Sequence, residues 1–253
     1  MKASRTIVGG LVALVAALLL LVVGANMWKS GLVVTKVMIV GNRVVNANEI
    51  LQLAHVKAGT KMYDLDLMVI RRDVVSHHFL KDVTVERDLP STLKITVVER
   101  TPIAMVNGKD VLYLDADGVV LPHSVSDELF DLPMISNIAR GVDLSLGAVV
   151  ENEDVSEALA ILSTARVVNK ELYHLISEIR LRDGGDLVFY MADGGVPVLY
   201  GRGGAAAKLV RLETFWNTVV RERGAQNLNY IDLRYEDQVV ARWNSAVRTS
   251  HTL

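Results

Sequence analysis

An apolar run near the N-terminus, Ile7–Met27, constrains this chain more than any other feature. It holds about 21 residues, mostly Ile, Val, Leu, Ala and Gly, and Asn26 is its only strongly polar side chain. A helix rises about 1.5 Å per residue, so the run spans about 30 Å, the hydrocarbon thickness of a bilayer. A helix also satisfies its own backbone groups in lipid. The sequence predicts a transmembrane helix over residues 7–28, after a short cytoplasmic tail over residues 1–6.

The orientation follows from the flanking charges. Lys2 and Arg5 precede the run, and a short basic N-terminus stays cytoplasmic while long C-terminal domains are translocated. The alternative is a cleaved signal peptide with Val23-Gly24-Ala25 as its cleavage site. The run is longer than the usual signal core, and Asn26-Met27-Trp28 is typical of an interfacial anchor, so an uncleaved anchor is favoured.

Composition excludes several classes of function. The chain has 27 Lys and Arg against 29 Asp and Glu, and two of the basic residues precede the anchor. The exported part is therefore slightly acidic and offers no basic patch for nucleic acid. There is no cysteine, which excludes thiol chemistry and cysteine-ligated metals, and stability must come from packing.

The first 70 residues after the anchor alternate between strand and helix patterns. A β-branched run over 33–40 predicts a strand, and two short helices follow, capped by Asn46 and Asp64. Residues 81–87 and 92–99 predict an antiparallel pair around the turn at 89–91. The order is strand, helix, helix, strand, strand.

The remainder predicts a sheet with helices packed against it. Asp115-Ala116-Asp117-Gly118 lies between apolar runs and indicates a hairpin. Apolar stripes at helical spacing predict two helices. The predicted elements are a short apolar run at 132–135, helices at 153–168 and 205–223, strands at 176–181, 187–191 and 196–200, and a last extended segment at 228–235 and 239–243. The fold class is α+β: a transmembrane helix, a small βααββ domain and a mixed β-sheet domain.

No constellation indicates catalysis or metal binding. Adjacent His77 and His78 point about 100° apart on a helix, so a solvated helix end is favoured over a zinc site. Asp115–Gly118 lacks the glycine and glutamate spacing of a calcium loop, and a hairpin turn is favoured. Gly201-Arg202-Gly203-Gly204 lacks the Lys-Ser/Thr of a phosphate loop, so it indicates a strand-to-helix turn. The sequence contains no Gly-x-Ser-x-Gly or Ser-x-x-Lys motif around a catalytic nucleophile, which argues against an enzyme.

The last segment is the most informative. Strand alternation places Tyr230, Asp232 and Arg234 on one face and Ile231, Leu233 and Tyr235 on the other. A last strand can lie at a sheet edge and recruit a partner strand, and Tyr, Arg and Trp dominate interface hot spots. The alternative is that Tyr235 and Trp243 are core aromatics and Arg234 is an ordinary surface charge. From the residues alone, both interpretations stay open.

Three stretches of the chain resemble a known protein family. Val40-Gly41-Asn42-Arg43, Leu89-Pro90 and the run from Val98 through Glu99-Arg100-Thr101-Pro102 to Ala104 resemble the POTRA domain of the FtsQ/DivIB family of bacterial cell-division proteins. The resemblance covers nearly the whole chain. It implies a POTRA domain over 29–102, a β domain over 103–245 and a C-terminal tail over 246–253. The six-residue cytoplasmic tail is shorter than in many members.

The resemblance implies a non-catalytic, essential-type divisome scaffold without a cofactor. It would span the inner membrane once at the septum, with its N-terminus cytoplasmic and its C-terminal domain periplasmic. It would bind FtsB, which travels with FtsL, and other divisome proteins through the POTRA domain. The implied FtsB-binding residues are Arg182, Tyr230, Arg234, Tyr235 and Trp243, with Arg180 as the alternative to Arg182. A membrane-anchored cell-wall enzyme and a POTRA-type assembly factor are the rival interpretations.

Overall fold

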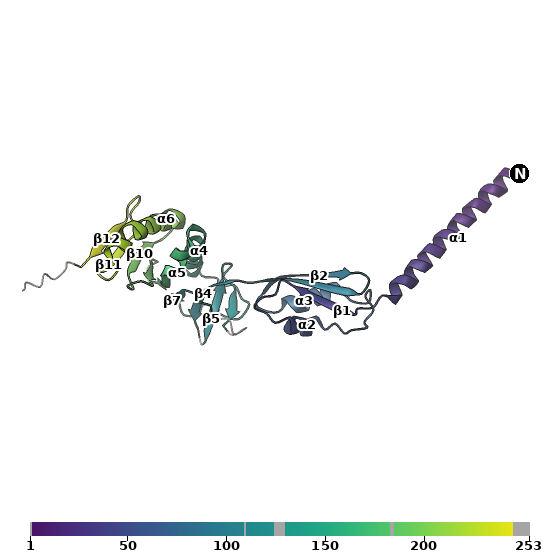
Figure 1. The fold of residues 1–253 in the computed structure, drawn as a ribbon, viewed down its shortest axis with the longest axis horizontal. Helices are drawn as coiled ribbons and strands as arrows, with labels where there is room; N and C mark the ends of the chain where they lie inside the picture. The colour runs from purple at the N-terminus through teal and green to yellow at the C-terminus, as the bar shows by residue number, and fades with distance from the viewer. Residues whose placement is uncertain (1, 109, 124–129, 183–184, 245–253) are drawn as a thin grey trace, which may run out of the picture. The chain divides into compact units, whose positions relative to one another are not determined.

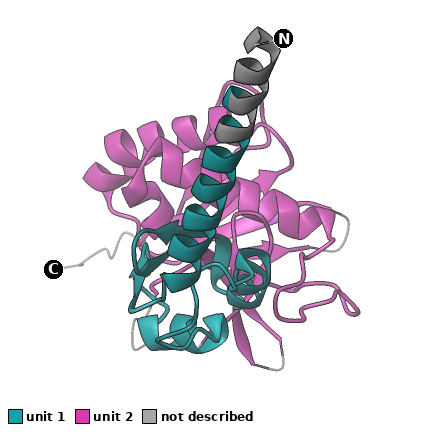
Figure 2. Cartoon of the chain, turned by 90° about the vertical axis from the view of Figure 1, so that its right-hand side faces the viewer, with its two compact units in different colours: residues 1–99 teal, residues 100–253 magenta. Residues whose placement is uncertain are grey.

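The computed structural model describes residues 2–108, 110–123, 130–182 and 185–244. The chain divides into two compact units, residues 1–99 and 100–253, which Figure 2 shows in different colours. The first unit begins with helix α1, Lys2–Gly31. Its stretch Leu14–Gly31 is long and apolar enough to cross a membrane, and none of that stretch is buried against the protein.

The rest of the first unit is a three-stranded sheet with two helices, and Figure 1 labels β1, β2, α2 and α3. Its elements are β1 (Lys36–Val40), α2 (Ala47–Ala54), α3 (Leu67–Val75), β2 (Leu80–Asp88) and β3 (Thr92–Glu99). The strand order is β1-β3-β2, with β1 parallel and β2 antiparallel to β3. The predicted element order is therefore confirmed.

Two caps define the helices of this unit. Asn46 caps α2, since its side chain accepts a hydrogen bond from Asn48 N. The prediction that Asp64 caps the second helix is wrong. Asp66 caps α3 by accepting hydrogen bonds from Met68 N and Val69 N, whereas the backbone N of Asp64 closes an earlier turn with Lys61 O. Asp66 holds this position because only its carboxylate lies where the first free N–H groups point.

The second unit contains a nine-stranded mixed sheet. Its strands are β4 (Pro102–Asn107), β5 (Val111–Asp115), β6 (Val120–Pro122), β7 (Met134–Ser136), β8 (Ile176–Leu181), β9 (Leu187–Met191), β10 (Pro197–Gly201), β11 (Leu228–Asp232) and β12 (Val240–Trp243). The strand order is β12-β11-β10-β9-β8-β7-β4-β5-β6. The α+β class with a mixed sheet is thus confirmed.

The helices of the second unit are α4 (Glu153–Val168), α5 (Lys170–Leu175), α6 (Ala205–Phe215), the π-helical segment η1 (Trp216–Val220) and α7 (Arg221–Arg223). The bounds of α4, β8 and β9 coincide with the sequence prediction. The helix predicted over 205–223 is continuous but widens into a π turn at η1. The sequence pattern missed α5 as an element and β4 as a strand.

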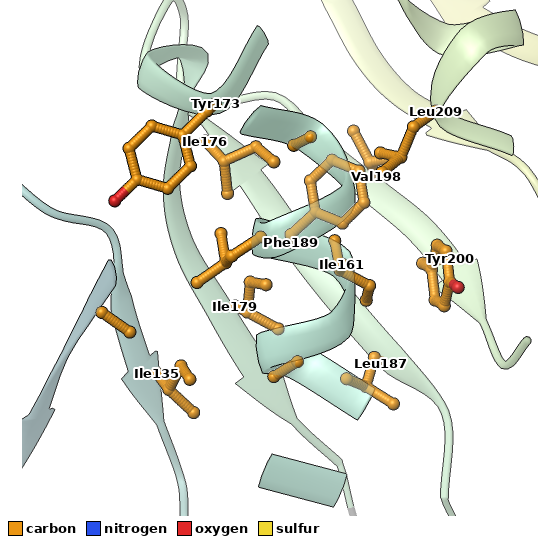
Figure 3. Close-up of a cluster of buried hydrophobic side chains, with 14 of the residues drawn as sticks. Ile135, Ile161, Tyr173, Ile176, Ile179, Leu187, Phe189, Val198, Tyr200 and Leu209 are labelled. Atoms are coloured by element: carbon orange, nitrogen blue, oxygen red, sulfur yellow. The ribbon is translucent and has the colours of Figure 1, made fainter. Parts of the chain in front are cut away.

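The core of the second unit lies between the helices and the sheet. Figure 3 shows Ile161 of α4 beside Ile179 of β8 and Phe189 of β9, all three fully buried. Buried Tyr173 of α5 donates a hydrogen bond to Ile103 O of β4 at 2.9 Å, and so ties a helix to the strand that opens the unit. β9 is buried along most of its length, and β8 alternates between buried and more exposed positions, so both strands contribute apolar side chains to this layer.

Candidate partner-binding edge

The site predicted from the last segment is built on β11 and β12 at one edge of the sheet. β11 runs parallel to β10, and β12 returns antiparallel to β11 with Asp232 opposite Val240 and Leu228 opposite Trp243. β12 is the terminal strand of the sheet, and within the described residues it pairs with β11 alone. The edge prediction is thus confirmed: the outer backbone groups of β12 have no neighbouring strand in that part of the chain (Figure 1).

Arg234 follows directly on the end of β11 and is fixed by Asp232. The Asp232 carboxylate, nearly all buried, accepts hydrogen bonds from Arg234 Nε at 3.0 Å and Nη2 at 2.7 Å. These bonds hold the pKa of Asp232 below its usual value and raise the pKa of the guanidinium. The Arg234 side chain remains 46% exposed, so a preoriented cation faces solvent.

The turn between β8 and β9 lies beside Arg234. Asp186 in this turn approaches Arg234 Nη1 at 3.7 Å, and Gly185 N donates to Arg182 O at 3.1 Å. Arg182 is exposed in the same turn. The fold therefore brings Arg182 and Arg234, 52 positions apart in the sequence, to the same end of the sheet.

Arg180, the alternative to Arg182, has a different environment. It lies on β8 and is exposed, with its guanidinium 4.9 Å from the ring centre of Tyr190 and 3.0 Å from Glu178. Its charge is therefore already paired on the surface of the strand. Arg182 is the nearer of the two to Arg234 along the connection that ends at Asp186.

Tyr230 lies in the middle of β11, half-buried, with Arg242 of β12 directly opposite. Ile231, its neighbour in the chain, is fully buried in the core cluster, so Tyr230 belongs to the opposite face of the sheet. The predicted alternation holds from Tyr230 to Arg234. It fails at Tyr235: the strand ends at Asp232, and Tyr235 is 50% exposed instead of sharing the buried side with Ile231 and Leu233.

Trp243 lies at the other end of the hairpin from Arg234 and Tyr235. Its ring is 6.0 Å from Phe215 of α6, and the Arg223 guanidinium lies 5.3 Å from it. Its indole Nε1 is buried without a hydrogen-bond partner in the described part of the chain. Trp243 therefore packs β12 onto the helices, as the core-aromatic alternative predicted, while Tyr235 points to solvent.

Sequence reasoning missed the residues that support this edge. Asp232 was assigned only to a face, yet it positions Arg234; Asp186 and Arg242 were not singled out. The spacing of Asp232 and Arg234, two residues apart at a strand end, was the available signal for the first. The positions of Asp186 near Arg234 and of Arg242 opposite Tyr230 result from pairing between segments that are distant in the sequence. No local sequence pattern predicts such pairing.

The other candidates have structural roles. Asp115 accepts hydrogen bonds from Asp117 N and Val119 N and pairs with Arg100 at 2.7 Å, and β5 and β6 form the predicted hairpin. The Gly201–Gly204 stretch is the predicted strand-to-helix turn, with Gly203 N donating to Glu157 at 2.8 Å. His77 Nδ1 accepts from Phe79 N, and its Nε2 lies 3.4 Å from Glu49.

Comparison with known proteins agrees with this architecture, a single apolar helix followed by a POTRA unit and a mixed-sheet unit. The family model of the POTRA domain, FtsQ-type, matches residues 32–100, and that of the cell division protein FtsQ/DivIB C-terminal region matches residues 104–234. The chain belongs to the FtsQ/DivIB family and has a role in cell division. The second match ends at Arg234, so Tyr235 and Trp243 lie beyond it.

Curated relatives support the same assignment. The chain is 34% identical to the cell division protein FtsQ of Geobacter sp. strain M21 over 200 residues, which cover 78% of this chain and 71% of the relative. It is 31% identical to FtsQ of Rhodothermus marinus over 225 residues, covering 86% and 80%. It is 28% identical to FtsQ of Geotalea daltonii over 200 residues, covering 79% and 72%.

Proposed function

We propose that this protein is a non-catalytic scaffold of the divisome that binds FtsB, and FtsL with it, along the edge strand β12. It would span the inner membrane once through α1, with its N-terminus cytoplasmic and both units periplasmic, at the division septum. There it would link early and late division proteins, the POTRA unit contacting other divisome proteins. Family membership supports this placement, and so do the basic residues Lys2 and Arg5, which precede the apolar run of α1.

The free edge of β12 is the observation that carries the proposal. A partner segment that pairs with Val240–Trp243 extends the sheet by one strand and satisfies the outer backbone groups. Because Ala241 and Trp243 pack toward the core, Val240 and Arg242 lie on the open face beside Tyr230. A partner strand along β12 would therefore meet Arg242 at the rim of that face.

Positive charge at the end of the β11–β12 hairpin favours a partner segment with acidic residues. Arg182 and Arg234 are both exposed there. Arg234 Nε and Nη2 already bind Asp232, so the remaining edge of Arg234 and the Arg182 guanidinium are the groups that would pair with a partner carboxylate. Tyr235 adds an exposed aromatic ring beside them. We therefore expect the FtsB segment to carry acidic residues near Arg234 and an apolar residue against Tyr235.

The experiment is a pull-down of FtsB by the full chain in detergent, with wild type compared with Tyr235→Ala. Because Tyr235 is exposed and makes no core contact, the variant should fold and lose most FtsB binding. Tyr63→Ala is the matched control: Tyr63 is exposed to a similar degree, 40% against 50%, but lies in the first unit. Binding by Tyr235→Ala at the wild-type level would exclude the β12 edge as the docking site. Absence of binding by the wild type would remove FtsB as the partner.

A further inference from the structure

The end of α1 is fastened to a loop of the POTRA unit. Met62 N donates to Leu32 O at 2.8 Å, Gly59 N donates to Val34 O at 2.8 Å, and Val33 forms a bridge with Lys61. α1 ends at Gly31, so these contacts lie within three residues of the helix. The loop therefore stays near the membrane end of α1 whatever the direction of the helix.

This fastening sets the depth of the loop in a bilayer. The apolar run ends at Met27, and the headgroup layer beyond the hydrocarbon is about 5–8 Å thick on each side. A helix rises about 1.5 Å per residue, so Lys29 lies about 3 Å beyond Met27. The ring centre of Tyr63 is 5.5 Å from Lys29 Nζ, so Tyr63, with Lys61 two residues before it, lies in the headgroup layer or at its outer boundary.

The loop gathers cations around one aromatic ring. The ring centre of Tyr63 lies 5.5 Å from Lys29 Nζ and 5.3 Å from the Arg87 guanidinium carbon. Arg87 is oriented by hydrogen bonds to Met62 O at 2.9 Å and Leu65 O at 2.7 Å. Lys61 is exposed next to Met62. Two positive charges therefore flank an exposed tyrosine, and Lys61 adds a third two residues before it in the same loop.

Among the residues that the structure describes, these cations have no acidic partner. In the described ranges, no carboxylate lies within 4.0 Å of Lys29, Lys61 or Arg87, although Asp64 belongs to the same loop. Like charges held around one ring favour a bound anion. In the headgroup layer the abundant anions are lipid phosphates, and clustered basic residues are attracted to a surface of anionic lipids. Tyrosine is also enriched at this depth.

We propose that Lys29, Lys61 and Tyr63 bind the phosphate groups of anionic phospholipids and so hold the POTRA unit against the bilayer surface. Arg87 positions the Tyr63 ring and adds its charge. Only the first unit takes part, and α1 must lie in a bilayer, but no division partner is required. A failure of FtsB binding would therefore leave this site standing, and the reverse also holds.

The test uses the full chain in nanodiscs and a single spin label. The chain has no cysteine, so Ala58→Cys, in the exposed part of the loop, carries the only label. Nanodiscs of pure phosphatidylcholine are compared with nanodiscs that contain phosphatidylglycerol. We expect accessibility of the label to a water-soluble relaxing agent to fall several-fold with phosphatidylglycerol. The fall should disappear in Lys29→Gln/Lys61→Gln.

Two controls make the result specific. Arg72→Gln/Lys94→Gln removes the same net charge elsewhere in the first unit and should keep the lipid effect. A label at Arg43→Cys, beyond the opposite end of β1, should show equal accessibility in both lipids. Equal accessibility of the Ala58→Cys label in both lipids would overturn the proposal. So would a lipid effect that survives in Lys29→Gln/Lys61→Gln.

Discussion

Asp232 accepts three hydrogen bonds from Arg234, two residues further along the chain: from its backbone N at 3.0 Å, Nε at 3.0 Å and Nη2 at 2.7 Å. The carboxylate is buried and the guanidinium is half exposed. The acid therefore turns the chain at the end of β11 and fixes the direction of the arginine in one contact. This relationship would couple the stability of the edge to the proposed binding of an acidic partner.

Asp232→Asn should destabilise the second unit by about 1–3 kcal/mol, because it removes a charged acceptor from a buried position. Denaturation followed by tryptophan fluorescence reports this unit well, since Trp216 and Trp243 both belong to it and Trp28 lies in α1. Asp186→Asn is the matched control: Asp186 is exposed and 3.7 Å from Arg234, so its effect should stay below about 1 kcal/mol. Equal losses in both variants would contradict the special role of Asp232.

The contribution of Asp232 to the free energy of unfolding should depend on pH. Its pKa is held below the ordinary value of about 3.9 chiefly by the hydrogen bond from the Arg234 side chain. At pH values between the lowered pKa of Asp232 in the folded protein and its ordinary pKa in the unfolded chain, the unfolded chain binds one more proton. The free energy of unfolding therefore rises with pH in that range. The stabilisation is present above pH 4 and is lost as pH falls through the lowered pKa.

The measurement is the difference in unfolding free energy between wild type and Asp232→Asn from pH 6 down to pH 2. Asp82 and Asp143 also have lowered pKa values, and they contribute equally to both proteins, so the difference isolates Asp232. We expect the difference to shrink as the pH falls below 4. A constant difference across this range would show that the Asp232–Arg234 contact does not depend on ionised Asp232.

Trp243→Ala should destabilise the second unit by about 1–3 kcal/mol, less than for a fully buried aromatic, since the residue is only half-buried. It should also speed amide exchange along β11 and β12, because the ring holds β12 against Phe215. Trp243→Phe keeps an aromatic ring and removes the unpaired buried N–H, so it should lower the free energy of unfolding by less than Trp243→Ala does. Wild-type exchange rates in Trp243→Ala would show that the ring does not hold the edge.

Gly201→Ala should both destabilise the sheet and displace Arg234. Gly201 has φ +71°, and an added Cβ would lie 3.0 Å from Arg234 Cγ. The left-handed conformation alone costs about 1–2 kcal/mol for alanine. Gly195→Ala is the matched control, since Gly195 has φ +60° and open space around the added carbon. Only Gly201→Ala should weaken FtsB binding; equal binding by both variants would show that Arg234 can move without loss.

Much of the secondary structure of this protein is determined by short stretches of its sequence. An apolar run of 21 residues, interrupted only by Asn26, indicates a membrane-crossing helix. A stripe of apolar residues at helical spacing predicted the bounds of α4, and short apolar runs separated by glycine turns predicted those of β8 and β9, because these signals need no knowledge of neighbouring elements. The Asp-Gly hairpin and the Asn46 cap are equally local. α5 was not predicted because its six residues hold fewer than two helical turns, and β4 was missed although it is as long as β8.

The tertiary structure decided what the site consists of. The position of β12 at the edge, the approach of the Arg182 turn to Arg234 through Asp186, and the packing of Trp243 on Phe215 all depend on strand order and on contacts between distant segments. Alternation assigned Tyr235 to the same face as Ile231 and Leu233, but β11 ends at Asp232, where the Arg234 contact turns the chain, and Tyr235 faces solvent. A period-two pattern holds only while the strand continues, and only long-range pairing determines where the strand ends.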